Sequence, residues 1–229
     1  MLPAFPDSLR EAALGSLERL EVEARTGSVV TEVDADGVSW RPTSVGLQPG
    51  GQDAKGGRIE AQTVLWAAGI AASPLTASLG VPLDGVGRVR TESTLTVPGH
   101  PNTFVVGDMC ALEQDGRWLP GVAQVAKQEG AHSARNILRA IAGQSLERFR
   151  YRDYGTMAVI GRGRAVADLG PFKASGFFAW LFWLFLHLFW LIGFRNRLAV
   201  MGEWAWAYVT LQRRVRLITG GRRETEKVE

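Results

Sequence analysis

The spacing of hydrophobic residues predicts one helix and a hairpin in the first part of the chain. In residues 7–20, leucines and alanines recur at the three- and four-residue intervals of one helix face, and Asp7 or Ser8 is expected to cap its start. A polar turn rich in Asp and Gly then separates two β-branched runs. This pattern predicts an antiparallel pair of strands over 28–33 and 37–40.

A third strand is predicted over 58–66, because apolar and polar residues there fit a pleated segment. Residues 41–57 before it are rich in Gly, Gln, Pro and Ser and predict a surface loop. The strand ends in the sequence Ala-Ala-Gly at 67–69. By itself, this tripeptide indicates a simple bend between a strand and a helix.

Residues 103–106, Thr-Phe-Val-Val, form a short apolar run that predicts a buried parallel strand. The run stops at Gly107 and Asp108. A glycine at this point lets a ligand approach the backbone, and a carboxylate at the carboxyl end of a strand can accept a hydrogen bond from a sugar or ribityl hydroxyl. Gly-Asp is also a common turn dipeptide, so the pair alone does not specify a ligand.

A long helix is predicted over 122–141, starting after Pro120-Gly121 and ending near Gly143. Its amino end offers unpaired N–H groups and a partial positive charge, which suit an anionic or electron-accepting ring. The residues expected on its buried face share an apolar side chain and are Val125, Ala134, Leu138 and Ile141.

Gln124 and Gln128 are four residues apart, so both project from one face of this helix, and His132 continues the same face. Polar residues at this spacing are also what a solvated helix face carries, and the spacing alone favours that alternative.

Residues 177–194 contain no formal charge and are dominated by Phe, Leu and Trp. As one helix they would measure about 27 Å, just short of a hydrocarbon core of about 30 Å. Four polar-tipped aromatic residues share an arc of about 80° at 100° per residue: Trp180, Trp183, His187 and Trp190. Together with a second segment over 198–218, they predict a helical hairpin lying in one leaflet. One transmembrane span over 177–194, a buried core hairpin and a dimer interface are the alternatives.

Charge and cysteine content narrow the class of protein further. The chain has 229 residues and a formal net charge of +3. Arginines concentrate around and beyond the apolar stretch, which favours anionic lipid as a partner; they are Arg195, Arg197, Arg213, Arg214, Arg216, Arg222 and Arg223. No nucleic-acid-binding motif accompanies them, so nucleic acid is not an expected partner. Cys110 is the single cysteine, which excludes an intrachain disulfide and a zinc site built on several cysteines. No secretory signal is visible, so the active part is expected on the cytoplasmic side.

Two motifs together carry a family resemblance. Phe-Val-Val-Gly-Asp at 104–108, followed by Ala-Gln-Val-Ala-Lys-Gln-Glu-Gly at 123–130, resembles the second flavin motif of type II NADH:quinone oxidoreductases. The resemblance implies an α/β, two-dinucleotide-domain flavoprotein fold, present here in part, with a carboxyl-terminal membrane-associated helical hairpin. It also implies non-covalent FAD, NADH as a substrate, a membrane quinone as acceptor, attachment to the cytoplasmic face of the cell membrane, and a possible homodimer.

The same resemblance implies site residues. The aspartate matching Asp108 holds the ribityl chain of FAD, and the backbone matching 124–126 faces the isoalloxazine ring. The implied cofactor-binding residues are Ala68, Gly69, Gly107, Asp108, Ala123, Gln124, Val125 and Ala126. The glutamines matching Gln124 and Gln128 line the quinone pocket, so these two are the expected catalytic residues, and no metal ligand is implied.

The resemblance also assigns domains. It implies that 1–70 is the remaining part of an NADH-binding domain, that 71–170 is the second part of an FAD-binding domain with a β-hairpin, and that 171–229 is the membrane-anchoring helical region. The family needs two GxGxxG phosphate loops, and neither occurs in this sequence. The chain is therefore expected to correspond to the carboxyl-terminal half of a full enzyme, with an amino-terminal half as a possible partner.

Three alternatives remain at this point. The first is a non-catalytic, membrane-bound fragment or subunit without the nucleotide loops. The second is a sulfide:quinone oxidoreductase, which shares the fold but needs reactive cysteines beside the flavin; a single cysteine counts against it. The third is a ferredoxin- or rubredoxin-type reductase, which has no use for the aromatic tail.

Overall fold

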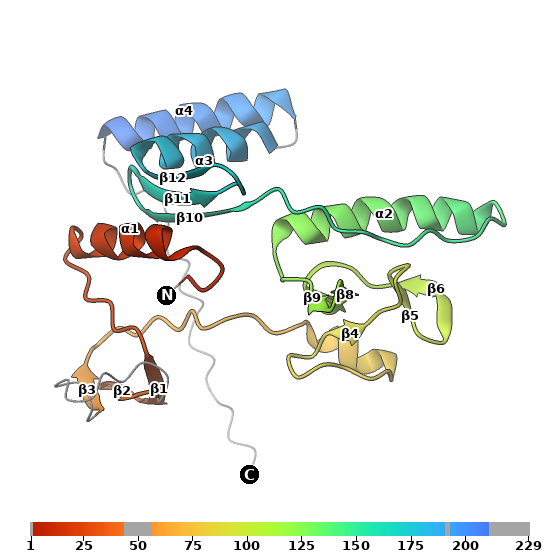
Figure 1. The fold of residues 1–229 in the computed structure, drawn as a ribbon, viewed down its shortest axis with the longest axis horizontal. Coiled ribbons are helices and arrows are strands. Elements are labelled where there is room, and N and C mark those ends of the chain that lie inside the picture. The colour runs from red at the N-terminus through yellow and green to blue at the C-terminus, as the bar shows by residue number, and fades with distance from the viewer. Residues whose placement is uncertain (1, 44–55, 191–192, 211–229) are drawn as a thin grey trace, which may run out of the picture. The chain divides into compact units, whose positions relative to one another are not determined.

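The computed structural model describes residues 2–43, 56–190 and 193–210, which form two compact units (Figure 1). Residues 1–24 and 156–229 belong to the first unit, and residues 25–155 belong to the second. The division into three parts at residues 70 and 170 is a different partition and stays a prediction.

A three-stranded antiparallel sheet forms the centre of the first unit. Its strands are β10 (Thr156–Gly161), β11 (Arg164–Asp168) and β12 (Lys173–Gly176), with β11 in the middle. Successive side chains of a strand point to opposite faces of the sheet, so β11 contributes residues to two hydrophobic cores. Val166 packs against helix α1 (Asp7–Glu18), whereas its neighbours Ala165 and Ala167 pack against helix α3 (Phe177–Trp190).

The predicted helix over 7–20 is confirmed as α1, but its predicted cap is wrong. Pro6 occupies the N-cap position and forms no side-chain cap in the described structure. Asp7 is already the first helical residue, and its carboxylate pairs with Arg10 one turn later. A proline at this position fixes the backbone entry to the helix, which leaves Asp7 to act on the positive end of the helix dipole.

The predicted hairpin at the start of the second unit is confirmed. Strands β1 (Ser28–Val33) and β2 (Gly37–Pro42) pair antiparallel, and β3 (Gly57–Glu60) pairs with β2. β3 ends at Glu60, so the strand predicted over 58–66 is shorter than expected. Most of the loop predicted over 41–57 lies outside the described residues.

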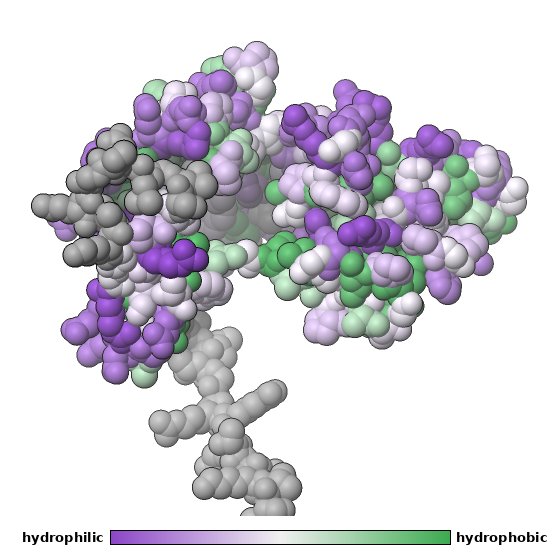
Figure 2. All heavy atoms as spheres, turned by 60° about the horizontal axis from the view of Figure 1, so that its bottom comes forward, coloured by the Kyte–Doolittle hydropathy of each residue, from purple (hydrophilic) through white to green (hydrophobic). Residues whose placement is uncertain are grey.

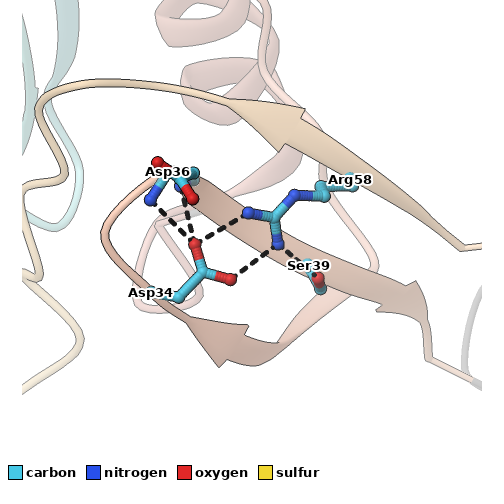
Figure 3. Close-up of polar contacts among 5 residues, drawn as sticks. Asp34, Asp36, Ser39 and Arg58 are labelled. Atoms are coloured by element: carbon cyan, nitrogen blue, oxygen red, sulfur yellow. Dashed lines mark hydrogen bonds and ion pairs between the residues drawn. The ribbon is translucent and has the colours of Figure 1, made fainter.

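Asp34 organises the turn between β1 and β2 (Figure 3). One of its carboxylate oxygens accepts hydrogen bonds from the backbone N–H groups of Asp36 and Gly37 at 2.9 and 3.0 Å. Both oxygens accept from the Arg58 guanidinium at 2.7 and 2.8 Å. The Arg58 hydrogen bonds and those of the turn lower the pKa of Asp34 to about 2.

The remainder of the second unit consists of short elements and one long helix. The short elements are η2 (Pro74–Leu79), β4 (Val89–Arg90), β5 (Thr96–Val97), β6 (His100–Phe104), η3 (Gly107–Met109), β7 (Cys110–Ala111), β8 (Glu113–Gln114) and β9 (Arg117–Trp118). The helix is α2 (Ala123–Ile141), which confirms the helix predicted over 122–141. The core beneath these elements gathers Val89, Leu95, Val97, Val105, Cys110, Leu112 and Phe149.

The prediction of a buried parallel strand over 103–106 is wrong in its pairing. β6 pairs antiparallel with β5, the strand just before it. Gly99, between the two strands, has a φ of +77°, and this left-handed backbone turns the chain back on itself. Within the run, only Val105 is fully buried. A local hairpin therefore replaces the expected parallel partner.

The buried face of α2 also differs from the prediction. Val125 is buried, but Ala134 is exposed, and Leu138 and Ile141 are 67% and 79% exposed. The other buried positions of α2 carry polar side chains: Glu129, His132, Ser133 and Asn136. These residues lie on the same face as Val125, whereas Ala134, Leu138 and Ile141 lie on the opposite face of the helix, so only Val125 of the predicted face was placed correctly.

The tail forms two helices rather than one span. α3 ends at Trp190, and α4 (Phe194–Thr210) begins four residues later, so the single span over 177–194 is not formed. Within the residues that the structure describes, no helix has both the length and the apolarity needed to cross a membrane. The two helices pack through aromatic pairs, with Trp180 edge-on to Tyr208 and Trp183 stacked on Trp204. The last eight positions of the segment predicted over 198–218 lie outside the described residues.

Candidate functional site

The turn that follows β6 places Gly107 and Asp108 against α2. Gly107 has a φ of +68°, a backbone conformation that favours glycine. A Cβ on Gly107 would lie 3.4 Å from the Cβ of Ala126, so the turn and the first turns of α2 are in close contact. Asp108 is exposed. Its carboxylate is therefore open to a ligand at the carboxyl end of the strand.

A second close approach brings the segment around Gly69 to the same place. A Cβ on Gly121, just ahead of α2, would lie 3.1 Å from Ile70 Cδ1 and 3.5 Å from Asp108 Oδ1. Ala68 and Gly69 are exposed, and Gly69 has a φ of +115°. Three predicted parts of the site, two of them more than fifty residues apart in sequence, thus meet around Gly121.

The backbone N–H groups at the amino end of α2 are available as hydrogen-bond donors. Val122 occupies the N-cap, and in the described part of the chain no side chain caps it. The N–H groups of Ala123 to Val125 precede that of Ala126, which donates the first intrahelical hydrogen bond to the Val122 carbonyl, so they point out of the helix end. The Val125 side chain is buried in the core, which leaves only its backbone for a ligand.

The two predicted catalytic glutamines are held differently. The side-chain amide of Gln128 makes two hydrogen bonds to the backbone of Arg152. Its Nε2 donates to the Arg152 carbonyl at 2.8 Å, and its Oε1 accepts from the Arg152 N–H at 3.0 Å. Gln124 Nε2 donates to the carbonyl of Gly155 at 2.7 Å. Gln124 Oε1 is buried and has no hydrogen-bond partner among the described residues. Of the two glutamines, only Gln124 therefore keeps a side-chain oxygen without a hydrogen-bond partner among the described residues.

His132, the third residue of this predicted face, is a structural residue. It is buried, and its Nε2 lies 2.9 Å from the carbonyl oxygen of Glu147. Its ring packs edge-on against Phe149 at 5.4 Å. The solvated face that spacing alone favours is not formed, because the segment after α2 runs back along the helix and takes up these side chains.

Glu129 is the residue that the sequence reading missed. It is 1% exposed, and its Oε2 accepts a hydrogen bond from the Gly107 N–H at 2.6 Å. Burial raises its pKa, against the opposing effect of the Gly107 and Cys110 hydrogen bonds. A signal was available, since Glu129 lies four residues after Val125 and three before His132 on one face.

Cys110 is buried beside this carboxylate. Its Sγ lies 3.3 Å from the hydroxyl of Thr91. Burial and the neighbouring Glu129 raise the pKa of the thiol to about 12. A thiol with this pKa is protonated at neutral pH and is a poor nucleophile.

A cavity of about 580 Å³ lies elsewhere, at the β1–β3 sheet, and it contains none of the predicted site residues. Its lining residues include Asp36, Arg58 and Glu60. Within residues 2–43, 56–190 and 193–210, no cluster of three or more His, Cys, Asp or Glu residues is placed to hold a metal ion.

Comparison with protein families identifies the class of protein to which the chain belongs. Residues 1–130 match the pyridine nucleotide-disulphide oxidoreductase family, and the chain belongs to it. Residues 154–214 match the NDH2 C-terminal domain. The resemblance seen in the two sequence motifs is confirmed, as is the α/β flavoprotein fold class.

Individual relatives narrow the class. The chain is 38% identical over 220 residues to the type II NADH:quinone oxidoreductase Ndh of Mycobacterium tuberculosis, covering 93% of this chain and 45% of that protein. It is 34% identical over 165 residues to the enzyme of the same name from Staphylococcus saprophyticus, covering 70% of this chain and 38% of that protein. The chain thus spans less than half the length of these curated relatives.

Solved structures agree on the fold. NDH2 of Plasmodium falciparum in complex with NADH superposes with a TM-score of 0.79 at 15% identity, covering 94% of this chain and 57% of that chain. The sulfide:quinone oxidoreductase of Aquifex aeolicus gives a TM-score of 0.57 at 13% identity, covering 88% of this chain and 45% of that chain. At these identities the likeness concerns the fold alone.

Proposed function

We propose that this chain is the carboxyl-terminal part of an FAD-dependent NADH:quinone oxidoreductase. The observation that carries the proposal is the meeting of the Gly107–Asp108 turn, the segment at Gly69 and the uncapped start of α2 around Gly121. The match of the following residues to the NDH2 C-terminal domain supports it. The relatives named as type II NADH:quinone oxidoreductases suggest NADH and a quinone as the substrates.

The residues present fit a non-covalently bound FAD. Asp108 is exposed and can accept a hydrogen bond from a ribityl hydroxyl, while the N–H groups of Ala123 to Val125 can donate to electron-rich ring atoms. Ala68, Gly69 and Gly107 carry no large side chain that would keep a ligand from the backbone. When bound, the flavin supplies the two-electron redox chemistry, and these residues supply its placement.

The two glutamines have separate proposed roles toward a quinone. Gln124 is the ligand-facing residue, because its buried Oε1 needs a donor such as a hydroquinone hydroxyl. Gln128 holds the backbone of Arg152, so its contribution to catalysis is to keep that segment against α2. Neither amide can release a proton.

The exposed apolar side chains of α3 and α4 support attachment to one leaflet of a membrane; the cytoplasmic face is the side that we propose for it. Large hydrophobic residues on both helices are more than 45% exposed, including Phe178, Phe185, Phe189, Phe194, Leu198 and Val209. Patches of this kind on a soluble surface mark membrane or protein contacts. A second copy of the chain is the alternative occupant, and it would make the protein a homodimer.

The second unit also presents surface that fits an amino-terminal partner half. Figure 2 shows hydrophobic side chains gathered on part of the visible surface of this unit. Exposed apolar residues of this unit include Leu65, Trp66, Ile70 and Leu75. The described parallel pair β4–β7 contains two residues in each strand, and parallel strands are stable only within larger, covered sheets.

The first experiment measures FAD binding to the purified chain by the quenching of flavin fluorescence. We expect binding to the unsubstituted chain, and at least a tenfold weaker affinity in Asp108→Ala. The matched control, Asp36→Ala, removes an exposed aspartate of the same unit and should bind like the unsubstituted chain. If no flavin binds, the chain by itself is the non-catalytic fragment described above.

The second experiment separates the glutamines in the chain joined to the amino-terminal region that its relatives carry. We expect Gln124→Ala to lower quinone reduction more than NADH-to-ferricyanide activity. Gln128→Leu should also lower quinone reduction, but with reduced thermal stability, because it releases Arg152. Equal losses in the two electron-acceptor assays would reject the quinone-site role of Gln124.

A sulfide:quinone oxidoreductase is disfavoured by Cys110. The thiol is buried, and a pKa of about 12 keeps it protonated. Sulfide oxidation through a cysteine beside the flavin requires an accessible thiolate. The fold likeness to such an enzyme therefore does not extend to the chemistry of this residue.

A further inference from the structure

Glu129 has an environment that its sequence position does not explain. It is among the largest fully buried side chains, and within the described residues no salt bridge balances its charge. Burying a carboxyl group in this way is unfavourable unless hydrogen bonds satisfy its oxygens. The residue is thus held at a cost in stability, and its contacts indicate what it does.

The contacts of Glu129 lie at the two ends of one turn, η3 (Gly107–Met109). Oε2 accepts from the N–H of Gly107, the first residue of η3. The carboxyl group is also close enough to Cys110, the residue that follows the turn, to raise the pKa of its thiol, and Thr91 hydrogen-bonds the same thiol. The carboxyl group of α2 therefore binds the start of the three-residue segment whose middle residue is Asp108, and it lies beside the residue that ends this segment.

We propose that Glu129 is a positioning residue that fixes the Gly107–Asp108 turn to α2, so that the Asp108 carboxylate is set in place before a ligand arrives. The proposal rests on the proposed function, in which Asp108 binds the FAD ribityl chain. Glu129 itself touches no ligand in this role. It acts through Gly107 and Cys110.

The backbone of the turn explains why a side-chain anchor is needed. Gly107 has a left-handed φ, and glycine has more conformational freedom to lose than any other residue. Without an acceptor for its N–H, this turn would be free to move relative to α2. α2 is nineteen residues long and is fixed along its length by polar contacts, so it is a rigid support for the anchor.

The experiment follows the Gly107 amide directly, by nuclear magnetic resonance of the ¹⁵N-glycine-labelled chain between pH 4 and pH 9. The titratable groups next to Glu129 are Asp108 and Cys110. We expect the Gly107 amide shift to titrate in Asp108→Asn, where the adjacent carboxylate is removed, but not in the double variant Asp108→Asn/Glu129→Gln. We also expect Glu129→Ala to exchange this amide with solvent at least tenfold faster.

Binding of FAD is the second measurement. Glu129→Ala should weaken FAD affinity about tenfold, whereas Glu129→Gln, which keeps an acceptor oxygen, should stay within threefold of the unsubstituted chain. Rescue by glutamine distinguishes positioning from a need for charge. If Glu129→Ala does not fold, the comparison of Gly107 titration between Asp108→Asn and Asp108→Asn/Glu129→Gln decides the question alone.

Two results would overturn the inference. One is a Gly107 amide that still titrates in Asp108→Asn/Glu129→Gln. The other is faster Gly107 exchange in Glu129→Ala with unchanged FAD affinity, while Asp108→Ala still loses affinity. Failure of the proposed function has a different signature, because Asp108→Ala would then bind FAD as well as the unsubstituted chain.

Discussion

α2 and the α3–α4 pair differ in the polarity of the side chains that they bury and of those that they expose. α2 buries Glu129, His132, Ser133 and Asn136 and exposes Leu138 and Ile141. α3 is almost wholly apolar, yet in its described residues only Ala179 and Trp180 are buried. In neither region does burial follow the hydrophobicity of the residues.

The reason differs between the two regions. Along α2, the returning segment 144–155 presents backbone N–H and carbonyl groups, so the helix face it covers must supply hydrogen-bond partners. α3 packs against the β10–β12 sheet and against α4, and the apolar surface that stays exposed on the described residues of both helices is left for lipid in the proposed function. Polar burial in α2 thus indicates precise placement of a site, and apolar exposure in α3–α4 indicates attachment.

The largest expected effect is on membrane binding. Phe178 and Phe185 are 79% and 65% exposed, and full burial of each side chain is worth about 1.5–3 kcal/mol. We expect the double substitution Phe178→Glu/Phe185→Glu to lower the partition coefficient on phosphatidylcholine–phosphatidylglycerol vesicles at least hundredfold. Vesicle sedimentation measures this change.

The matched control for that experiment is Leu138→Glu/Ile141→Glu, which places the same charges on exposed apolar positions of α2. Its vesicle binding should stay within threefold of the unsubstituted chain. Unchanged binding of the α3 variant, with loss of a dimer in analytical ultracentrifugation, would assign the α3–α4 surface to a contact between two copies instead.

The next largest effect concerns the polar interior of α2. Asn136 is 0% exposed; its amide donates to the carbonyls of Thr94 and Glu147 and accepts from the Glu147 N–H. Asn136→Ala leaves these groups unpaired and should lower the free energy of unfolding by about 3 kcal/mol. Leu138→Ala, at an exposed position, should change it by less than about 0.5 kcal/mol. Urea unfolding measures both, and the reverse ranking would contradict the polar interior.

A smaller effect concerns the pH dependence of stability. Burial raises the pKa of Glu129 above its ordinary value of 4.5, so the folded chain binds more protons there than the unfolded chain does. This contribution is therefore fully present below pH 4.5 and is lost as the pH rises through the raised pKa. We expect Glu129→Gln to remove this loss in a series of urea unfolding curves from pH 4 to pH 9. Parallel pH profiles for the two chains would show that Glu129 titrates normally.

The last prediction involves no change in stability and tests whether the residues around Glu129 and Cys110 remain inaccessible to solvent in the folded chain. With a pKa of about 12, the Cys110 thiol should react with N-ethylmaleimide at pH 8 at least hundredfold more slowly in the folded chain than in urea. Mass spectrometry follows the modification. Comparable rates in both conditions would mean that the turn opens readily.

Much of the local structure was predictable from the sequence, and the failures share a cause. The spacing of apolar residues located α1 and α2, and the Asp34 turn located the β1–β2 hairpin, because these signals lie within a few residues. The antiparallel pairing of β6 was missed because it depends on which partner strand is available. The buried face of α2 was missed because segment 144–155 covers it with backbone N–H and carbonyl groups. Such groups need polar partners, so the hydrophobicity of the helix residues does not indicate which of them are buried.

The sequence alone determined the Gly107–Asp108 turn, the positions of Gln124 and Gln128 on one helix face and the family to which the chain belongs. It did so because turn chemistry, helix spacing and motif order are properties of neighbouring residues. Only the tertiary structure decided that Gln128 binds Arg152, that Gln124 keeps an unpaired oxygen, and that Glu129 anchors the turn. These outcomes depend on hydrogen bonds between segments more than twenty residues apart, and such bonds exist only once the chain has folded.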